Sequence, residues 1–177
     1  MTDDRAQAAG GHSEEDLSAD TPLVVVRLLA FPLQVFSAAR LHHDELLREF
    51  ALLALASADV VDVRSLPARL VDLIDILGRR YAADTERSDA VRDEAVERGD
   101  VVIDLTYRLP PSVAESVRRL NALLDEADEF CRSEQLLTLA ATQVERDFRS
   151  WFLSEFERQL NGGAPTRWAG PLSVPPR

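Results

Sequence analysis

The sequence predicts a mainly α-helical protein, a bundle of four to five helices with a candidate two-stranded β element at about 23–30 and 101–109. Two observations favour helices: apolar residues recur every three or four positions, and capping residues flank several of these stretches. Two short β-branched stretches favour the strands. We expect one helical domain over 22–160, between a disordered acidic segment, 1–21, and a Pro/Gly-rich tail, 161–177.

In the first half of the domain, the sequence predicts one strand and three helical stretches. Leu23–Ala30 starts with β-branched residues, which indicates a strand, and Pro32 stands where a helix can begin. The buried stripe predicted for that helix is Val35, Ala39, His43, Leu46, Phe50 and Leu53. A second helix, capped by Ser65, has the stripe Leu66, Leu70, Leu73, Ile74, Leu77 and Tyr81. The charged stretch Thr85–Gly99 predicts a short peripheral helix that buries Ala90, Val91, Ala95 and Val96.

The second half predicts one strand and two longer helices. Val101–Leu109 alternates in polarity, with Ile103, Leu105, Tyr107 and Leu109 on one face, so it can pair with Leu23–Ala30 in a ribbon packed on helices. Ser112 and Glu115 form a capping-box pattern before a long helix that reaches Cys131. A last helix runs from about Gln143 to Leu160. Trp168, within the tail, is expected to pack on the body of the protein or on a partner.

Composition narrows the function classes. The net charge of −11 argues against nucleic-acid binding and against anionic membrane surfaces. All 20 basic residues are arginine, which excludes Schiff-base chemistry and a P-loop lysine. No stretch is apolar enough to span a membrane, and the acidic N-terminus does not resemble a secretory signal. With Cys131 as the single cysteine, which we expect to be a buried structural thiol, the cytoplasm is the expected location.

The candidate switch or ligand site is the stretch Arg40–Leu55, where titratable groups meet an apolar stripe. Its candidate residues are His42, His43, Asp44, Glu45, Arg48 and Glu49. The helical pattern places His43 on the apolar face and His42 about 100° away, beside Glu45 and Glu49. Three roles remain open for the histidines: packing in the helix, accepting a phosphoryl group or switching, and contributing to a metal site.

Two further clusters are candidates for contacts with other molecules. Asp125, Asp128 and Glu129 form an acidic patch on one helical face, which can be solvated, can be recognised by a partner's arginines, or can bind a hard cation. The aromatic cluster Phe148, Trp151, Phe152 and Phe156 belongs to the core or to a dimer face. We predict no metal site and no cofactor, since no metal-binding, nucleotide-binding or catalytic motif is present in the sequence.

Several runs of the sequence resemble a family of uncharacterised helical proteins from GC-rich actinobacteria. The runs are VVRLLAFP, HHDELLREFALLAL, LPARLVDLID, DLTYRLPP, LLDEADEFCRSEQLLTLA and FRSWFLSEF, which together cover about Val24 to Phe156. Members of this family are encoded beside partner-switching regulators: an anti-sigma kinase, its antagonist and a serine phosphatase. The resemblance implies a context of stress or sigma-factor signalling, and it assigns no catalytic residue.

These observations favour a non-enzymatic, cytoplasmic regulatory protein that forms a homodimer or binds a protein partner. An enzymatic function stays open, because catalytic sites exist that carry none of the known motifs. The alternative is a phosphorelay protein or a metal or ligand sensor centred on His42 and His43. A third option is a bundle with an apolar pocket between its helices, into which polar groups such as Arg48 or Tyr107 converge.

Overall fold

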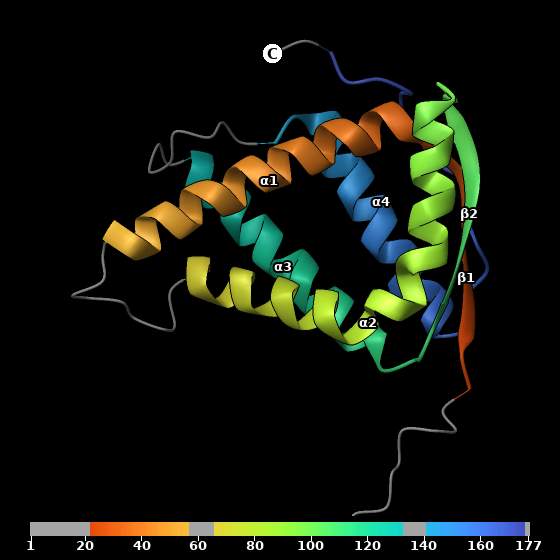
Figure 1. The fold of residues 1–177 in the computed structure, drawn as a ribbon, viewed down its shortest axis with the longest axis horizontal. Coiled ribbons are helices and arrows are strands. Elements are labelled where there is room, and N and C mark those ends of the chain that lie inside the picture. Colours follow the sequence, from red (N-terminus) through yellow and green to blue (C-terminus); the bar gives the residue numbers. More distant parts are fainter. Residues whose placement is uncertain (1–21, 57–65, 133–140, 176–177) are drawn as a thin grey trace, which may run out of the picture.

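The predicted fold class is confirmed by a computed structural model, which describes residues 22–56, 66–132 and 141–175. These residues form four helices and a two-stranded antiparallel sheet (Figure 1). The elements are β1 (Val24–Pro32), α1 (Leu33–Ala56), α2 (Leu66–Glu97), β2 (Val102–Leu109), α3 (Val113–Arg132) and α4 (Gln143–Leu160). The acidic segment 1–21 and the side chain of Cys131 lie outside the described part, so the predictions made for them stay predictions.

The predicted pairing of the two strands is confirmed. β1 runs antiparallel to β2, with Val24 opposite Leu109 and Pro32 opposite Val102. The register shifts between Leu28 and Phe31, where Ala30 has a left-handed φ of 57°. That conformation is costly for a residue with a Cβ. The Asp104 carboxylate offsets part of the cost, because it accepts a 2.8 Å hydrogen bond from the Ala30 amide.

Both edges of the sheet are covered, which satisfies backbone groups that an edge strand would otherwise expose. At the β2 edge, the Ser88 hydroxyl of α2 donates to the Thr106 carbonyl at 2.6 Å. At the β1 edge, the Gln159 side chain of α4 exchanges two hydrogen bonds with the backbone of Arg27, at 2.8 and 2.9 Å. Further along β1, the Trp168 amide donates to the Leu29 carbonyl at 2.9 Å.

Helix α2 joins two stretches that the sequence predicts as separate helices. It is continuous but bends sharply near its middle, so its second half runs beside the strands (Figure 1). The Thr85 hydroxyl donates to the Ala82 carbonyl at 3.3 Å, a type of bond that bends helices. The burial predicted for the second half is wrong except at Ala95, since Ala90, Val91 and Val96 are exposed. The buried residues there are Ser88, Arg92 and Ala95.

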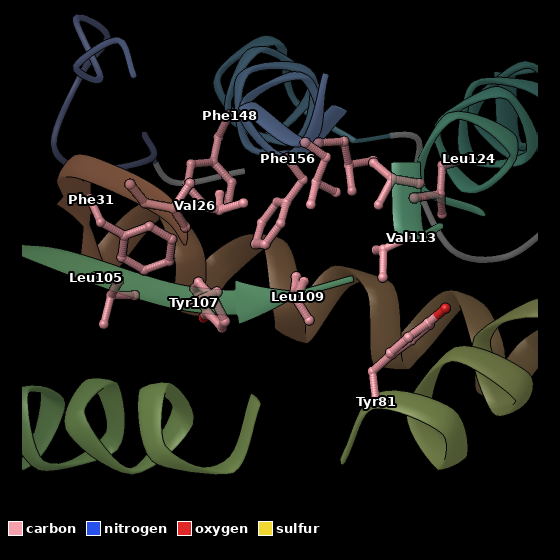
Figure 2. Close-up of a cluster of buried hydrophobic side chains, with 14 of the residues drawn as sticks. Val26, Phe31, Tyr81, Leu105, Tyr107, Leu109, Val113, Leu124, Phe148 and Phe156 are labelled. Atoms are coloured by element: carbon pink, nitrogen blue, oxygen red, sulfur yellow. The ribbon is translucent and has the colours of Figure 1, made fainter. Parts of the chain in front are cut away.

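The core is one cluster of buried side chains to which both strands and all four helices contribute, and part of it lies between the inner face of the sheet and α4. Figure 2 shows Phe31, Tyr107 and Phe156 among these buried side chains, and the Tyr107 and Phe156 rings are 5.2 Å apart. Burial of the Tyr107 phenol raises its pKa to about 12, with Asp89 adding to the shift. No helix in the described part of the chain is both long and apolar enough to cross a membrane.

The residues after α4 pack against this core. Trp168 is 9% exposed, and its ring lies 5.8 Å from Phe148 and 5.5 Å from Trp151. The buried carboxylate of Glu155 accepts hydrogen bonds from the amide and the hydroxyl of Thr166. The expected packing of Trp168 on the body of the protein is therefore confirmed.

Candidate functional site

A pocket of about 230 Å³ lies between α1, α3 and α4. Its walls are largely apolar side chains: Phe36, Ala39 and Leu46 from α1, Leu120 and Leu124 from α3, and Phe148, Phe152 and Leu153 from α4. Its polar lining comprises Arg40, His42, His43, Asp128, Glu145 and Arg149. An apolar cavity with a few convergent polar groups is the usual form of a small-molecule site.

Both histidines line this pocket. His43 lies there with Ala39 and Leu46, as predicted, whereas the prediction that His42 points away from this face is wrong. His42 is 6% exposed and His43 is half-buried. Leu46 is four residues from His42 and three from His43, so either histidine can share its helical face. The packing of α1 against α4 decides between the two, and the local spacing of apolar residues does not contain that information.

Burial lowers the pKa of His43 from its ordinary value of 6.5. The nearby Asp44 carboxylate opposes this shift, whereas His42 and Arg149 add to it. The imidazole is therefore neutral at pH 7, with one nitrogen that can donate a hydrogen bond and one that can accept. A neutral imidazole suits an apolar pocket better than a cation would.

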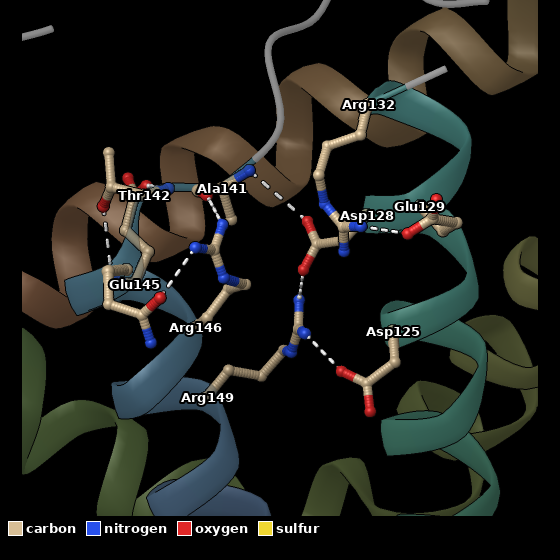
Figure 3. A network of polar contacts seen from close by, with 10 residues as sticks. Asp125, Asp128, Glu129, Arg132, Ala141, Thr142, Glu145, Arg146 and Arg149 are labelled. Atoms are coloured by element: carbon tan, nitrogen blue, oxygen red, sulfur yellow. Dashed lines mark hydrogen bonds and ion pairs between the residues drawn. The ribbon is translucent and has the colours of Figure 1, made fainter.

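The wall formed by α3 and α4 contains a buried ion pair (Figure 3). One terminal nitrogen of Arg149 lies 2.8 Å from Asp128 and the other lies 2.6 Å from Asp125. Asp128 also accepts a 3.3 Å hydrogen bond from the Ala141 amide. The Nε atom of Arg149 is buried and has no hydrogen-bond partner among the described residues. A buried donor without an acceptor costs about 1–3 kcal/mol, so a ligand that supplied an acceptor would be favoured.

The predicted acidic patch is divided by this network. Asp128 is 2% exposed and lies at the pocket, while the side chains of Asp125 and Glu129 are 63% and 71% exposed. Asp128 is not solvated, because α4 packs along α3 and brings Arg149 onto it. Glu129 pairs with Arg132 at the surface.

Glu145 is a pocket residue that the sequence analysis missed. Its carboxylate accepts a 2.7 Å hydrogen bond from the Thr142 amide, and the Thr142 hydroxyl accepts one from the Glu145 amide at 3.3 Å (Figure 3). This reciprocal capping box starts α4. The pattern Thr142-x-x-Glu145 is visible in the sequence and could have located both residues. Arg149, also missed, leaves no such local signal.

The other candidate residues of α1 lie outside the pocket lining. Asp44 and Arg48 are exposed, and Glu45 and Glu49 are half-buried. The polar groups that converge on the pocket are therefore not the expected ones, since neither Arg48 nor Tyr107 lines it.

The predicted aromatic interface is mostly engaged within the chain. Phe148 and Phe156 are buried, and Trp151 and Phe152 are half-buried. Phe148 stacks on Phe152 with ring centroids 5.8 Å apart, and both line the pocket. These rings therefore connect the core to the candidate site and leave little free surface for a partner.

The polar chemistry that the pocket lining offers is that of imidazole, carboxylate and guanidinium groups. None of the described residues that line the pocket is serine, threonine or cysteine. Within the described part of the chain, no group of three or more histidine, cysteine, aspartate or glutamate side chains is placed to hold a metal ion. Comparisons of the chain with protein-family models, with curated proteins and with solved structures found no match.

Proposed function

We propose that this protein is a non-enzymatic regulatory protein that binds a small, largely apolar molecule in the pocket between α1, α3 and α4. The observation that carries the proposal is the pocket itself, whose walls are apolar side chains from three helices. Ligand pockets usually measure about 300–1,000 Å³. At about 230 Å³ this one suits a ligand of few heavy atoms.

The charges at the pocket favour a neutral ligand. Both terminal nitrogens of Arg149 are already engaged by carboxylates, so a ligand anion would compete with Asp125 and Asp128. The buried Nε of Arg149 and the neutral His43 can each serve one polar group of a ligand. We therefore expect a compact apolar body that carries a single hydrogen-bond acceptor.

For the helix that carries His42 and His43, the geometry favours ligand binding over phosphoryl transfer. A phosphoryl-accepting imidazole must be reached by a donor protein, whereas His42 is 6% exposed and His43 is half-buried against an apolar pocket. A metal sensor would need a third ligand beside the two histidines, and among the described residues no three such side chains are grouped closely enough to hold an ion.

Binding can be tested with two molecules of nearly equal size. Acetophenone has a carbonyl acceptor and ethylbenzene has none, so we expect acetophenone to bind at least about fivefold more tightly, the effect of one hydrogen bond of about 1 kcal/mol. The measurement is an NMR titration that follows the amide resonances of His43 and Phe148. If neither compound produced saturable shifts, the proposal would be wrong.

A pocket-filling variant supplies the control. Ala39→Phe places a ring in the cavity and should abolish binding, because Ala39 lines the pocket. Ala51→Phe adds the same ring at an exposed position of the same helix and should leave binding intact. Equal binding by both variants would place the ligand elsewhere.

The regulatory part of the proposal requires a protein partner or a second copy of the chain. The observation that favours it is the outer surface of α1, where Leu41 and Leu52 are 60% and 61% exposed on the helix that also lines the pocket. The resemblance to proteins encoded near partner-switching regulators makes an anti-sigma kinase or its antagonist the expected partner. Such a partner would sense the ligand through α1.

The partner can be sought by affinity capture of the tagged full chain from its own cells, followed by mass spectrometry. We expect one regulator in stoichiometric amount, lost with Leu41→Ser and retained with Leu172→Ser, a substitution at another exposed leucine. A strict monomer that captures no regulator would contradict the interaction role and leave ligand binding to be judged separately.

A further inference from the structure

A second hollow lies between the C-terminal half of α2 and β2. It has a volume of about 520 Å³, and we call it the α2–β2 groove. Its lining is Leu23, Ala83, Arg87, Ser88, Thr106 and Arg108, none of which lines the pocket described above. The described lining thus contains two guanidinium groups and two hydroxyl groups, and no carboxylate.

A hydrogen bond holds the two walls of the groove together. The Ser88 hydroxyl donates to the Thr106 carbonyl at 2.6 Å, and Ser88 is buried. Arg87 immediately precedes Ser88 on the helix, and Arg108 follows Thr106 by two residues on the same face of the strand. The bond therefore fixes the backbone positions from which both guanidinium groups extend.

Neither arginine has a carboxylate partner within the described part of the chain. One turn further along α2, Arg92 shows the contrasting arrangement, with Asp89 at 2.6 Å and Asp93 at 2.8 Å. Arg87 also lines an adjoining hollow, whose described lining includes the carboxylate of Asp104, and this carboxylate accepts a hydrogen bond from the Ala30 amide.

Two arginines that lack a carboxylate partner among the described residues are unexpected in one groove of a chain whose net charge is −11. Such a site attracts anions from solution because its positive charge is not cancelled locally. Guanidinium groups bind the oxygens of phosphate in pairs, with two parallel hydrogen bonds from each group. A small oxyanion also matches a groove whose lining is predominantly polar.

We propose that the α2–β2 groove binds a phosphate group, carried by free phosphate or by a small phosphorylated molecule. Arg87 and Arg108 bind the phosphate oxygens from opposite walls, and the Thr106 hydroxyl donates a further hydrogen bond. This site is separate from the apolar pocket and does not depend on the function proposed for that pocket.

The test is an NMR titration of the full chain with inorganic phosphate and, separately, with glycerol 3-phosphate. Sodium chloride at matched ionic strength serves as the reference. We expect saturable shifts at the amides of Arg87, Ser88, Thr106 and Arg108 with both phosphates. Tighter binding of glycerol 3-phosphate would identify a phosphorylated molecule as the ligand, and equal binding would identify free phosphate.

Variants separate specific binding from general attraction. Arg87→Ala and Arg108→Ala should each weaken phosphate binding at least tenfold, the usual effect of losing a charged hydrogen bond. The phosphate affinity of Arg108→Lys should fall between those of the wild type and Arg108→Ala, since lysine keeps the charge but cannot bind two oxygens in a planar geometry. Arg119→Ala removes the same charge from an exposed position on α3 and should leave the affinity within twofold.

Two results would overturn the proposal. The first is the same amide shifts with chloride as with phosphate, which would show only ionic screening. The second is an equal loss of affinity in Arg119→Ala and Arg87→Ala, which would show that net charge and not the groove determines binding. Thermal melts of each variant establish that it is folded before its affinity is compared.

Discussion

The pocket between α1, α3 and α4 and the α2–β2 groove both contain arginine, but they place its charge differently. In the pocket, Arg149 is largely buried and is paired with Asp125 and Asp128. In the groove, Arg87 and Arg108 are exposed and have no carboxylate partner in the described part of the chain. A buried charge must be paired, because desolvation would otherwise cost several kcal/mol, whereas an exposed charge can remain open to a ligand.

This difference indicates what each site can bind. The charge of Arg149 in the pocket is paired within the protein, and the rest of the lining leaves an apolar surface for a neutral molecule. The open charge of the groove contributes little to stability and favours an anion. Removing a charge at the pocket should therefore affect folding strongly, while removing a charge at the groove should affect binding alone.

The largest effect is expected from Trp168→Ala. The ring contacts Phe148, which lines the pocket, so its loss should lower the free energy of unfolding by about 3–5 kcal/mol and weaken the pocket. Urea unfolding measures the first effect, and the acetophenone titration measures the second. Leu172→Ala, at an exposed position after Trp168, is the control and should cost less than about 0.5 kcal/mol. A loss below about 1 kcal/mol for Trp168→Ala would show that the C-terminal stretch does not support the pocket.

The next effect is expected from Asp128→Ala. Removing this carboxylate leaves the Ala141 amide without its acceptor and Arg149 without its buried partner, which should destabilise the protein by about 3 kcal/mol. Asp125→Ala removes the exposed partner of the same arginine and should cost at most about 1 kcal/mol. Equal losses for the two variants in urea unfolding would contradict the distinction between buried and exposed charge.

Most of the fold could be predicted from the sequence, because the patterns that indicate its helices and strands are local. Helical spacing predicted the stripe with Leu70 and Leu73, and alternation predicted the inward face with Leu105 and Tyr107. The burial pattern of the second half of α2 could not be predicted in this way. This half buries Ser88 and Arg92 against β2, where hydrogen bonds and ion pairs replace apolar contacts.

The candidate site could be predicted from the sequence only in part. The stretch with His42 and His43 was identified, because histidines within an apolar helix are a visible signal. Its polar partners were not, since Arg149 reaches Asp128 across 21 positions of the chain. Similarly, the approach of Arg87 to Arg108 depends on how α2 bends, which no local spacing encodes.

A smaller effect on stability is expected from phosphate at the groove. At ten times its dissociation constant, phosphate should stabilise the wild-type protein by about 1.4 kcal/mol, the free energy of saturating one site. The double variant Arg87→Ala/Arg108→Ala should lose this stabilisation, and the pocket-filling variant Ala39→Phe should keep it. Thermal melts in phosphate and in chloride at equal ionic strength provide the comparison. Loss of the phosphate effect in Ala39→Phe would mean that the two sites are not independent.

The smallest effect is a pH dependence that originates at His43. Because the folded state lowers the pKa of this imidazole from 6.5, the unfolded chain binds more protons as the pH falls through 6.5 toward the folded value. The contribution of His43 to stability is therefore fully present above pH 6.5 and decreases as the pH falls below it. Urea unfolding of the wild type at pH 7.5 and pH 5.5 should show this decrease, and His43→Gln should show a smaller one, since glutamine does not titrate. Carboxylates contribute equally to both proteins, so the difference between their slopes isolates His43. A steeper loss in His43→Gln would mean that the imidazole is protonated in the folded protein, and the pocket would then favour an anionic ligand, as the groove does.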